Sequence, residues 1–225
     1  SDEAYTPPRD PGPHDLRGQH GRYMLSTLFK GDEKSDSFTG IYESPVFVLE
    51  GRKVSFLIEG GNHDGTRVEI RTVDGEVLFR AHGKNNVNLR RVEWDASGAA
   101  GKSLVVRVVD HERGGWGHIS FDDFRARGRI DRKATRARRR EMRMRWLRRL
   151  RDGLQADTGR LKKAIDNLSD TFPERYDGAR GYRRRLSEIS RGAAKDLSPT
   201  AAARERLEKL RRRLDALTRE ALRAN

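Results

Sequence analysis

Gly114-Gly115-Trp116-Gly117-His118-Ile119-Ser120-Phe121-Asp122-Asp123-Phe124 is the stretch that decides how this chain is organised. The sequence before it reads as short strands, and the sequence after it reads as arginine-rich helix. Glycines on both sides of Trp116 permit backbone conformations with positive φ, so we expect a turn that carries this ring on a loop. The ring is then either a cover on the core or a flat platform for a ligand, and the sequence leaves both interpretations open.

The residues that precede this stretch have the pattern of an antiparallel β-domain. About eight short runs with strand character are separated by turn signals, and no helical segment interrupts them. Residues 104–109 are almost all apolar, which predicts a central strand. Asp74-Gly75 between two alternating runs predicts a hairpin whose turn needs positive φ at both central positions. This pattern favours a β-sandwich, specifically a jelly roll.

The residues that follow it change to a helical period from Arg132 onward. We expect a long helix to Leu168, a shorter helix around Leu186, and a last helix that begins at Ser198-Pro199 with Ser198 as N-cap. The last helix carries a heptad-like apolar stripe made of Leu207, Leu210, Leu214 and Leu217. The stripe needs a partner, which is either the first helix, packed antiparallel, or a second chain in a homodimer.

Three parts of the chain are therefore expected. Residues 1–20 hold four prolines and form an extended arm, residues 21–128 form the jelly-roll β-sandwich, and residues 129–225 form a basic α-helical hairpin or coiled coil. No apolar run approaches the ~20 residues needed to span a bilayer. No signal peptide is recognised, so targeting signals do not indicate a compartment.

The composition excludes several kinds of chemistry. The chain has no cysteine, so disulfide scaffolds, thiol nucleophiles and thiolate zinc sites are ruled out. The signatures of nucleophile-elbow hydrolases, zinc proteases, P-loop proteins and dinucleotide-binding proteins are absent. We therefore expect a protein without catalytic activity.

The charge is strongly positive and unevenly spread. The net charge is +14, and residues 129–151 hold twelve Arg or Lys against two Asp or Glu. Such a run attracts polyanions such as nucleic acid, although a solvated helix face is the more common explanation. The arginines that would contact a polyanion are Arg138, Arg139, Arg140, Arg143, Arg148 and Arg149.

The candidate ligand site lies in the strand-rich half. Trp116 could stack on the apolar face of a sugar while polar neighbours bond its hydroxyl groups. The residues proposed for this site are Trp116, His118, Asn62, His63 and Asp64. Asn62-His63-Asp64 is alternatively only a turn, because these residue types are common turn formers. Asp110-His111-Glu112 is expected to face this turn if both lie at the same end of the sandwich.

Asp122 and Asp123 are two carboxylates within an otherwise apolar strand. Strand alternation sends them to opposite faces, so one is expected on the core side. A buried carboxylate needs a partner, and a structural calcium ion is one candidate. A salt bridge to an arginine is the alternative, and it is slightly favoured.

Three motifs carry a resemblance to a known family. Residues 56–63 (FLIEGGNH), 92–95 (VEWD) and 114–119 (GGWGHI) together resemble a galactose-binding-like β-sandwich of the kind found beside levanase-type glycosidases. They are also similar to modules of large exported planctomycete proteins with cytochrome-like domains. The resemblance implies a non-catalytic, carbohydrate-binding or interaction module, periplasmic or extracellular, in a fragment of a longer multidomain chain. Its partners would be a saccharide and the other domains of that chain.

Two other functions remain open at this point. The arginine-rich helix could bind a polyanion or nucleic acid, and this binding would weaken steeply with salt. The leucine stripe could instead make the chain a structural spacer or an oligomerisation module.

Overall fold

The structure is a computed structural model that describes residues 18–20, 24–30, 33–171, 179–195, 197–198 and 200–223. The chain divides into two compact units, Ser1–Thr135 and Arg136–Asn225. Residues 1–17 of the expected N-terminal arm lie outside the described residues. The expected boundary after residue 128 falls inside a strand that continues to Ile130.

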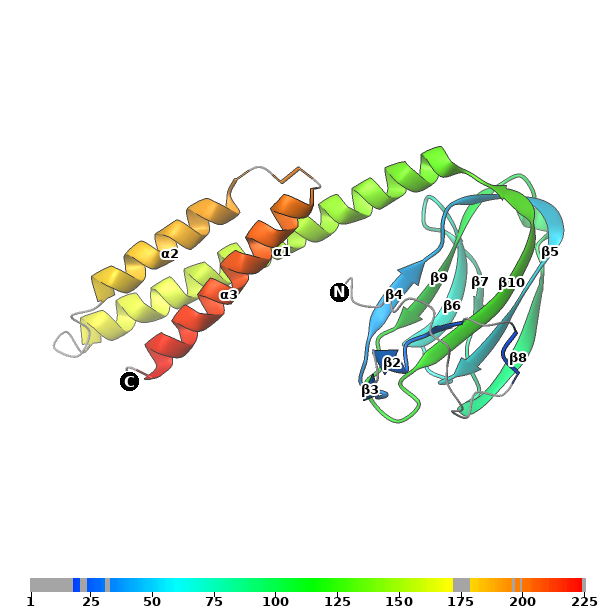
Figure 1. Ribbon diagram of the computed structural model, residues 1–225, viewed down its shortest axis with the longest axis horizontal. Helices are drawn as coiled ribbons and strands as arrows, with labels where there is room; N and C mark the ends of the chain where they lie inside the picture. Colours follow the sequence, from blue (N-terminus) through cyan, green and yellow to red (C-terminus); the bar gives the residue numbers. More distant parts are fainter. Residues whose placement is uncertain are drawn as a thin grey trace. The chain divides into compact units, whose positions relative to one another are not determined.

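The described part of the first unit is built from strands (Figure 1). They are β1 (Leu25–Ser26), β2 (Phe29–Lys30), β3 (Glu33–Lys34), β4 (Gly40–Glu43), β5 (Phe47–Gly60), β6 (Thr66–Thr72), β7 (Val77–Ala81), β8 (Asn86–Asp95), β9 (Ser103–Asp110) and β10 (Ile119–Ile130), with a single 3-10 turn, η2 (Ser97–Ala99). The predicted central strand is confirmed, because β9 pairs with β4, β5 and β6.

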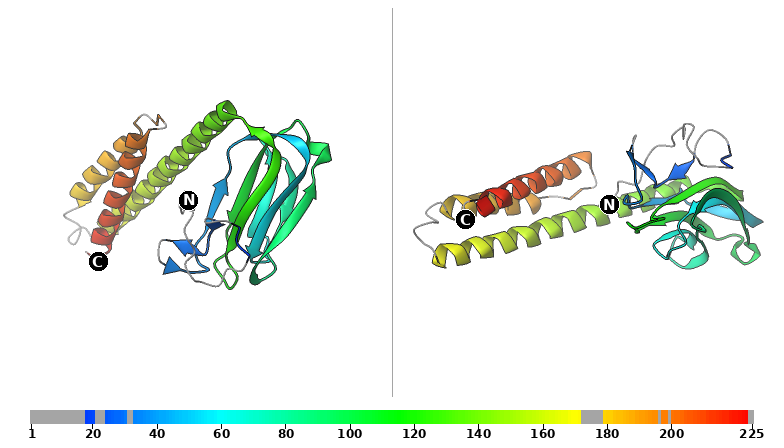
Figure 2. Two further views of the ribbon diagram at one scale, coloured as in Figure 1. Left: turned by 45° about the vertical axis from the view of Figure 1, so that its right-hand side comes forward. Right: turned by 90° about the horizontal axis from the view of Figure 1, so that it is seen from below.

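The main strands form two antiparallel layers, which Figure 2 shows from further directions. One layer has the order β4-β9-β6-β7 and the other has the order β1-β10-β5-β8. The first residues of β5 join the layers by pairing with β9, where Phe47 lies opposite Leu104. The antiparallel β-rich domain followed by helices is thus confirmed, while the jelly-roll connection pattern stays a prediction.

The core of the sandwich lies between these layers and is rich in β-branched and aromatic residues. Phe56 of β5 is fully buried, and its ring centroid lies 6.4 Å from that of Phe79 and 5.3 Å from that of Phe121. Phe79 in turn stacks on Trp94 at 5.5 Å. Because Phe56 and Phe121 come from one layer and Phe79 from the other, these contacts hold the two layers together.

The hairpin between β6 and β7 differs from the prediction in its turn. Gly75 has a φ of 106°, but Asp74 is not in the positive-φ region. The backbone N–H of Thr72 donates to the carbonyl of Glu76 at 2.9 Å, so three residues form the loop. A three-residue loop of this kind needs positive φ only at its last position, which explains why one glycine suffices.

The described helices are α1 (Arg132–Thr171), α2 (Ala179–Ala193) and α3 (Ala201–Arg223). In Figure 2, α2 and α3 lie along the second half of α1, and the three share one apolar core. The three helices expected from the sequence are confirmed, while their description as a hairpin or coiled coil stays a prediction. No helix in the described part of the chain is both long and apolar enough to cross a membrane.

The leucine stripe of α3 packs within the chain. Its members, Leu207, Leu210, Leu214 and Leu217, are at most 7% exposed and share a core with Leu147, Leu154 and Ile165 of α1 and Leu186 and Ile189 of α2. The chain's own helices are thus the partner of the stripe. These side chains have almost no surface left for a second chain, so the structure does not support the homodimer alternative, which stays a prediction.

The N-terminal caps of two helices can be compared with the prediction. The hydroxyl of Thr200 accepts a hydrogen bond from the N–H of Ala203 at 3.2 Å, so Thr200 caps α3 and Ser198 does not. Asp131 caps α1 by accepting from the N–H of Ala134 at 2.8 Å. Both caps satisfy an N–H group that has no partner within its helix.

Candidate functional site

Three loops meet at one end of the sandwich, and we call residues 60–65, 82–85 and 114–118 the loop end. The N–H of Gly61 donates to the carbonyl of His118 at 2.9 Å, which joins the first loop to the third. The N–H of Asn85 donates to the carbonyl of Gly60 at 2.8 Å, which joins the second loop to the first. The first loop therefore lies between the other two.

Two glycines make this close approach possible. A Cβ atom on Gly61 would clash with the backbone carbonyl oxygen of Trp116, and a Cβ atom on Gly83 would clash with that of Gly60. Backbone atoms cannot swing away as the end of a long side chain can, so these positions require glycine. The glycine-rich composition of the loop end thus has a packing reason of its own.

Trp116 stands at the surface of the loop end. Its side chain lies outside the core cluster of the described residues, and the residue is 37% exposed. Its backbone has a φ of 61°, which is a strained conformation for a bulky residue. A hydrogen bond of 3.2 Å from its N–H to the Asp36 carboxylate holds this conformation, together with the 2.8 Å bond from Gly117 N–H to the Gly114 carbonyl.

His118 is buried, in contrast to the prediction that it contacts a ligand. Its ring Nδ1 lies 2.6 Å from Asp36 Oδ1, its Nε2 lies 3.4 Å from Glu59 Oε2, and the residue is only 4% exposed. Burial by itself would lower the pKa of His118, but the hydrogen bonds and charges of Glu59 and Asp36 outweigh it and raise that pKa. His118 therefore anchors the loop instead of bonding a hydroxyl group at the surface.

Two buried carboxyl groups support this anchor. Glu59 is 1% exposed and Asp110 is fully buried. Burial raises the pKa of Asp110 to about 6. Sequence reasoning assigned no role to Glu59, although a carboxylate at the end of an apolar strand was the signal that could have found it. Asp36 was missed because it lies in a polar loop with no pattern of its own.

The turn at residues 62–64 is held to its neighbours mainly by hydrogen bonds of its backbone. The N–H of Asn62 donates to the side-chain carbonyl of Asn85 at 2.7 Å, and the carbonyl of His63 lies 2.8 Å from Nδ1 of His82. The ring Nε2 of His63 lies 3.3 Å from the carbonyl of Gly115. The side chains of Asn62 and Asp64 remain exposed. The prediction that residues 110–112 face this turn is confirmed by the 2.9 Å hydrogen bond from His111 N–H to the Gly65 carbonyl.

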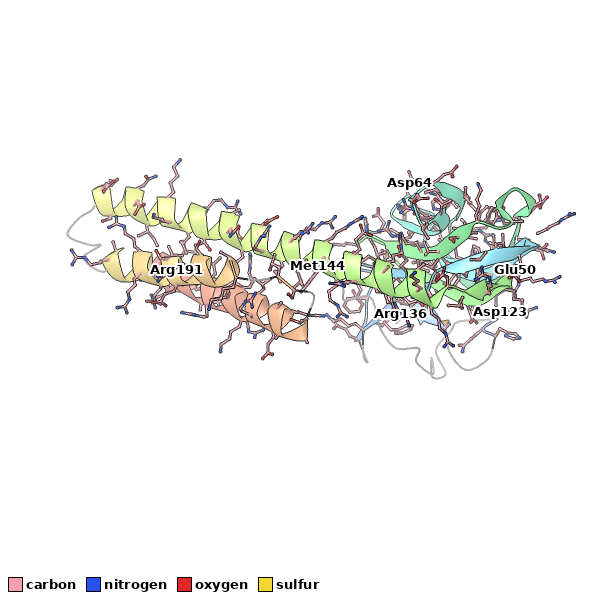
Figure 3. The ribbon with its side chains drawn as sticks, turned by 90° about the horizontal axis from the view of Figure 1, so that it is seen from above. Glu50, Asp64, Asp123, Arg136, Met144 and Arg191 are labelled. Carbon is pink, nitrogen blue, oxygen red and sulfur yellow. The ribbon has the colours of Figure 1, made fainter. Side chains whose placement is uncertain are left out.

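Asp122 and Asp123 are engaged by groups of the protein. Asp122 Oδ2 accepts from the backbone N–H of His20 at 2.7 Å, and Asp123 pairs with Arg91 and Arg125. These arginines lower the pKa of Asp123 to about 2. Asp123 thus makes the arginine salt bridge that was the alternative to calcium, while the calcium site itself stays a prediction. In Figure 3 Asp123 is well separated from Asp64 of the loop end.

The strand around these aspartates also breaks the expected alternation. The pairing of β10 with β5 shifts register after Asp122, and Asp123 has a φ of 45°. Phe121 lies opposite Ile58 of the core, so Asp122 faces away from the core, opposite Leu57. The expected carboxylate on the core side of this strand is therefore not present at these two positions.

The arginines of the polyanion alternative lie on the first half of α1. Arg139, Arg140, Arg143, Arg148 and Arg149 are exposed, and Arg138 is partly buried. The nearby acidic residues Glu141 and Asp152 pair with Arg145 and Arg151. These positions lie around the whole circumference of the helix, so the first half of α1 is solvated and strongly basic.

Comparison with known proteins gives one sequence similarity. No protein-family model matches the chain. A protein of Aspergillus rugulosus, ecdE, provisionally named as a glycosyl hydrolase, is 31% identical over 112 residues, which is 49% of this chain. The chain spans only 15% of the length of that protein. The likeness to levanase-type and planctomycete modules stays a prediction.

Two solved structures of Clostridium perfringens ZmpB also align with the chain. They contain its CBM51-2 carbohydrate-binding module and INT domains, and one has GlcNAc bound. The alignments cover 87% of this chain and 36% of theirs, at 12% and 11% identity, with a TM-score of 0.28 in both cases. Because chains with so low a TM-score do not superpose, these structures define neither the fold nor the ligand of this chain.

Proposed function

We propose that the sandwich is a non-catalytic saccharide-binding module with Trp116 as its stacking platform. The observation that carries this proposal is the surface position of the Trp116 ring on a loop whose strained backbone is held by Asp36. Strain of this kind persists where the surrounding structure fixes it, and such residues cluster at binding sites. An aromatic ring fixed in place can stack on a sugar at a small cost in entropy.

The polar neighbours of the platform divide into two groups with different tasks. Asn62 and Asp64 have exposed side chains that can bond sugar hydroxyl groups. His118 and Asp36 fix the loop, since both ring nitrogens of His118 face carboxylates. We therefore assign ligand contact to Trp116, Asn62 and Asp64, with His63 at the edge of the platform.

The absence of catalysis is part of the proposal and rests on the carboxyl groups. Glycoside hydrolysis needs two carboxyl groups that both reach the substrate. Asp64 is the one carboxylate among the residues assigned to ligand contact, Glu59 and Asp110 are buried, and Asp123 is paired with arginines. The similarity to a small part of a protein provisionally named as a glycosyl hydrolase fits an accessory module of a carbohydrate-active protein. We propose an exported location on the same grounds.

The experiment is a titration of the full chain with a panel of neutral oligosaccharides, followed by tryptophan fluorescence and calorimetry. For any oligosaccharide that binds, Trp116→Ala should weaken binding by roughly tenfold or more, since stacking contributes about 1 kcal/mol beyond the buried area. Ile130→Ala removes another exposed apolar side chain of the sandwich and is the matched control. Equal affinities of the Trp116→Ala variant and the wild type would refute the platform.

A second candidate function is polyanion binding by α1, favoured by the exposure of Arg139, Arg140 and Arg148 on one basic helix. Its signature is a logarithmic salt slope close to one per neutralised phosphate. Stacking at Trp116 should depend little on salt. Titration at low and high salt therefore separates the two functions.

A further inference from the structure

A slot opens at the edge of the sandwich between β7 and β8. These strands end the two layers, and among the described strands β7 pairs only with β6 and β8 only with β5. The slot has a volume of about 580 Å³ and is lined by Asn62, Phe79, Arg80, Ala81, His82, Gly83, Lys84, Arg90 and Val92. We call these nine residues the β7–β8 slot. Its volume is in the range of small-molecule sites.

The apolar part of the slot is rigid. Phe79, Ala81 and Val92 belong to or pack against the sandwich core, and Phe79 stacks on Trp94 at 5.5 Å. Phe79 is only partly buried, so part of this residue is available to the apolar face of a sugar ring, while Ala81 and Val92 are buried. Since core packing holds these side chains in place, little conformational entropy is lost when a ligand binds.

The polar part of the slot is cationic. Arg80, Lys84 and Arg90 line it, and none of the nine described residues that line it carries a carboxylate. Arg80 shares the single carboxylate of Glu69 with Arg67 and Arg71, so that group of four side chains keeps a net positive charge. The slot therefore presents a positive potential to an incoming ligand.

Arg90 is held in position and still has an unused donor. Its Nη2 donates to the carbonyl of His82 at 2.6 Å, which fixes the guanidinium group. Its Nε is buried and has no hydrogen-bond partner among the described residues. Because this Nε atom is buried, what Arg90 offers to a ligand in the slot is the positive charge of its fixed guanidinium group.

We propose that the β7–β8 slot binds the carboxylate or sulfate group of an acidic saccharide unit. This inference rests on the proposed function, since it names the ligand class of the same module. The slot adjoins the platform through one turn, in which Asn62 lines the slot and His63 Nε2 lies 3.3 Å from the Gly115 carbonyl. One oligosaccharide can thus place a neutral unit at Trp116 and an acidic unit between Lys84 and Arg90.

A saccharide suits the slot better than a nucleic acid does. Single-stranded nucleic acid binds along a groove that follows successive phosphates, with exposed aromatic rings between the bases. The slot instead is lined by one Phe, Tyr or Trp ring, that of Phe79, so it does not offer a series of rings to successive bases. The extended basic surface of this chain is that of α1, which the experiment can separate from the slot by mutation.

The test compares charged and neutral forms of the same oligosaccharide with the full chain. The probes are oligogalacturonate with its methyl ester, and a sulfated carrageenan oligosaccharide with its desulfated form. We expect tighter binding of at least one charged form by roughly tenfold, the value of a charge-assisted hydrogen bond. Lys84→Gln and Arg90→Gln should each remove most of this preference.

The controls separate the slot from general charge effects and from misfolding. Lys102→Gln makes the same change of charge at an exposed position of the sandwich outside the slot, and it should keep the preference. Arg90→Gln also removes the hydrogen bond to His82, so circular dichroism must confirm its fold. Lys84 is exposed, so Lys84→Gln is the variant that tests the slot without risk to the core.

Each outcome has one meaning. Equal binding of charged and neutral forms, still weakened by Trp116→Ala, would overturn the slot proposal and leave the saccharide function intact. Binding of no saccharide would overturn both. The preference for the charged form could also persist in Lys84→Gln and disappear in Arg148→Gln/Arg149→Gln. That result would assign the anion-binding site to α1 and overturn the slot proposal. Tighter binding of a single-stranded oligonucleotide, lost in Lys84→Gln, would also overturn it.

Discussion

The sandwich buries several of its carboxylates against a few partners, whereas the helical unit pairs its carboxylates with arginines at the surface. The side chains of Glu59 and Glu69 in the sandwich are at most 2% exposed. The pair Arg204–Glu208 on α3 is 54% and 36% exposed. Buried charges cost several kcal/mol when a partner is lost, while exposed pairs contribute about 0–1 kcal/mol. Buried charged groups therefore fix the positions of residues in the sandwich. In the helical unit the charged groups mainly form a solvated surface.

The largest expected effect tests whether the two regions are separate in stability. Phe56→Ala removes a fully buried ring and should destabilise the sandwich by about 3–5 kcal/mol without changing the stability of the helices. Leu207→Ala should do the reverse, at about 2–5 kcal/mol. Hydrogen exchange measured by mass spectrometry along a denaturant series reports each unit separately. Parallel loss of protection in both units would contradict the separation.

The next effect concerns the buried anchor. His118→Ala leaves Glu59 buried without its partner and should destabilise the sandwich by about 3 kcal/mol. It should also free the loop that carries Trp116, because Asp36 loses its 2.6 Å contact with the ring. Urea unfolding and the fluorescence of Trp116 measure the two consequences. A variant as stable as the wild type would show that the anchor has no structural role.

A smaller effect is the dependence of sandwich stability on pH. The pKa of His118 is raised, so its stabilising contribution is complete below about pH 6.5 and is lost as the pH rises through the higher folded value. The pKa of Asp110 is raised to about 6, so its contribution falls as the pH rises from about 4, where the unfolded chain ionises, to about 6, and it is constant above that. The unfolding midpoint should therefore fall between about pH 5 and pH 8.

Two variants show how much of this pH dependence comes from Asp110 and how much comes from His118. Asp110→Asn should flatten the part of the curve between about pH 4 and pH 6, and His118→Gln should flatten the part above about pH 6.5. The carboxylate of Asp123, whose pKa is lowered to about 2, acts in the opposite direction and only at acidic pH. A midpoint that rises from pH 5 to pH 8 would contradict the raised pKa values.

The smallest expected effect on stability belongs to the exposed arginines of α1. Arg148→Gln/Arg149→Gln should change the free energy of unfolding by no more than about 0.5 kcal/mol. It should reduce only salt-sensitive binding of a polyanion and leave binding of neutral saccharides unchanged. Chemical denaturation and titration with heparin or a single-stranded oligonucleotide measure both. Weaker binding of neutral saccharides by this variant would contradict the claim that the sandwich alone binds saccharide.

The elements with a regular period could be predicted from the sequence. The apolar run that became β9 and the leucine stripe of α3 each have a single period, so their element type followed directly. The residues between them were less predictable. The strand β5 continues through Gly51, because only the pairing partners decide whether a strand ends at a glycine.

The candidate site was predictable in its loops but not in the roles of its residues. The glycines around Trp116 indicated a loop, but whether its ring covers the core or stands at the surface was decided only by the structure. The burial of His118 depends on Asp36 and Glu59, which are distant in sequence, so no local pattern could reveal it. Similarly, Asp122 and Asp123 do not follow the expected alternation of side chains, because the register of β10 against β5 shifts after Asp122. The local sequence does not indicate this shift.

The most direct test of the central claim is to map a bound saccharide by nuclear magnetic resonance on the isotope-labelled full chain. An oligosaccharide that binds should shift the amide signals of residues 60–65, 82–85 and 114–118, together with the indole signal of Trp116. The signals of α1, α2 and α3 should stay unchanged. Shifts confined to the arginines of α1, with the loop end unaffected, would contradict the account and assign ligand binding to the helices.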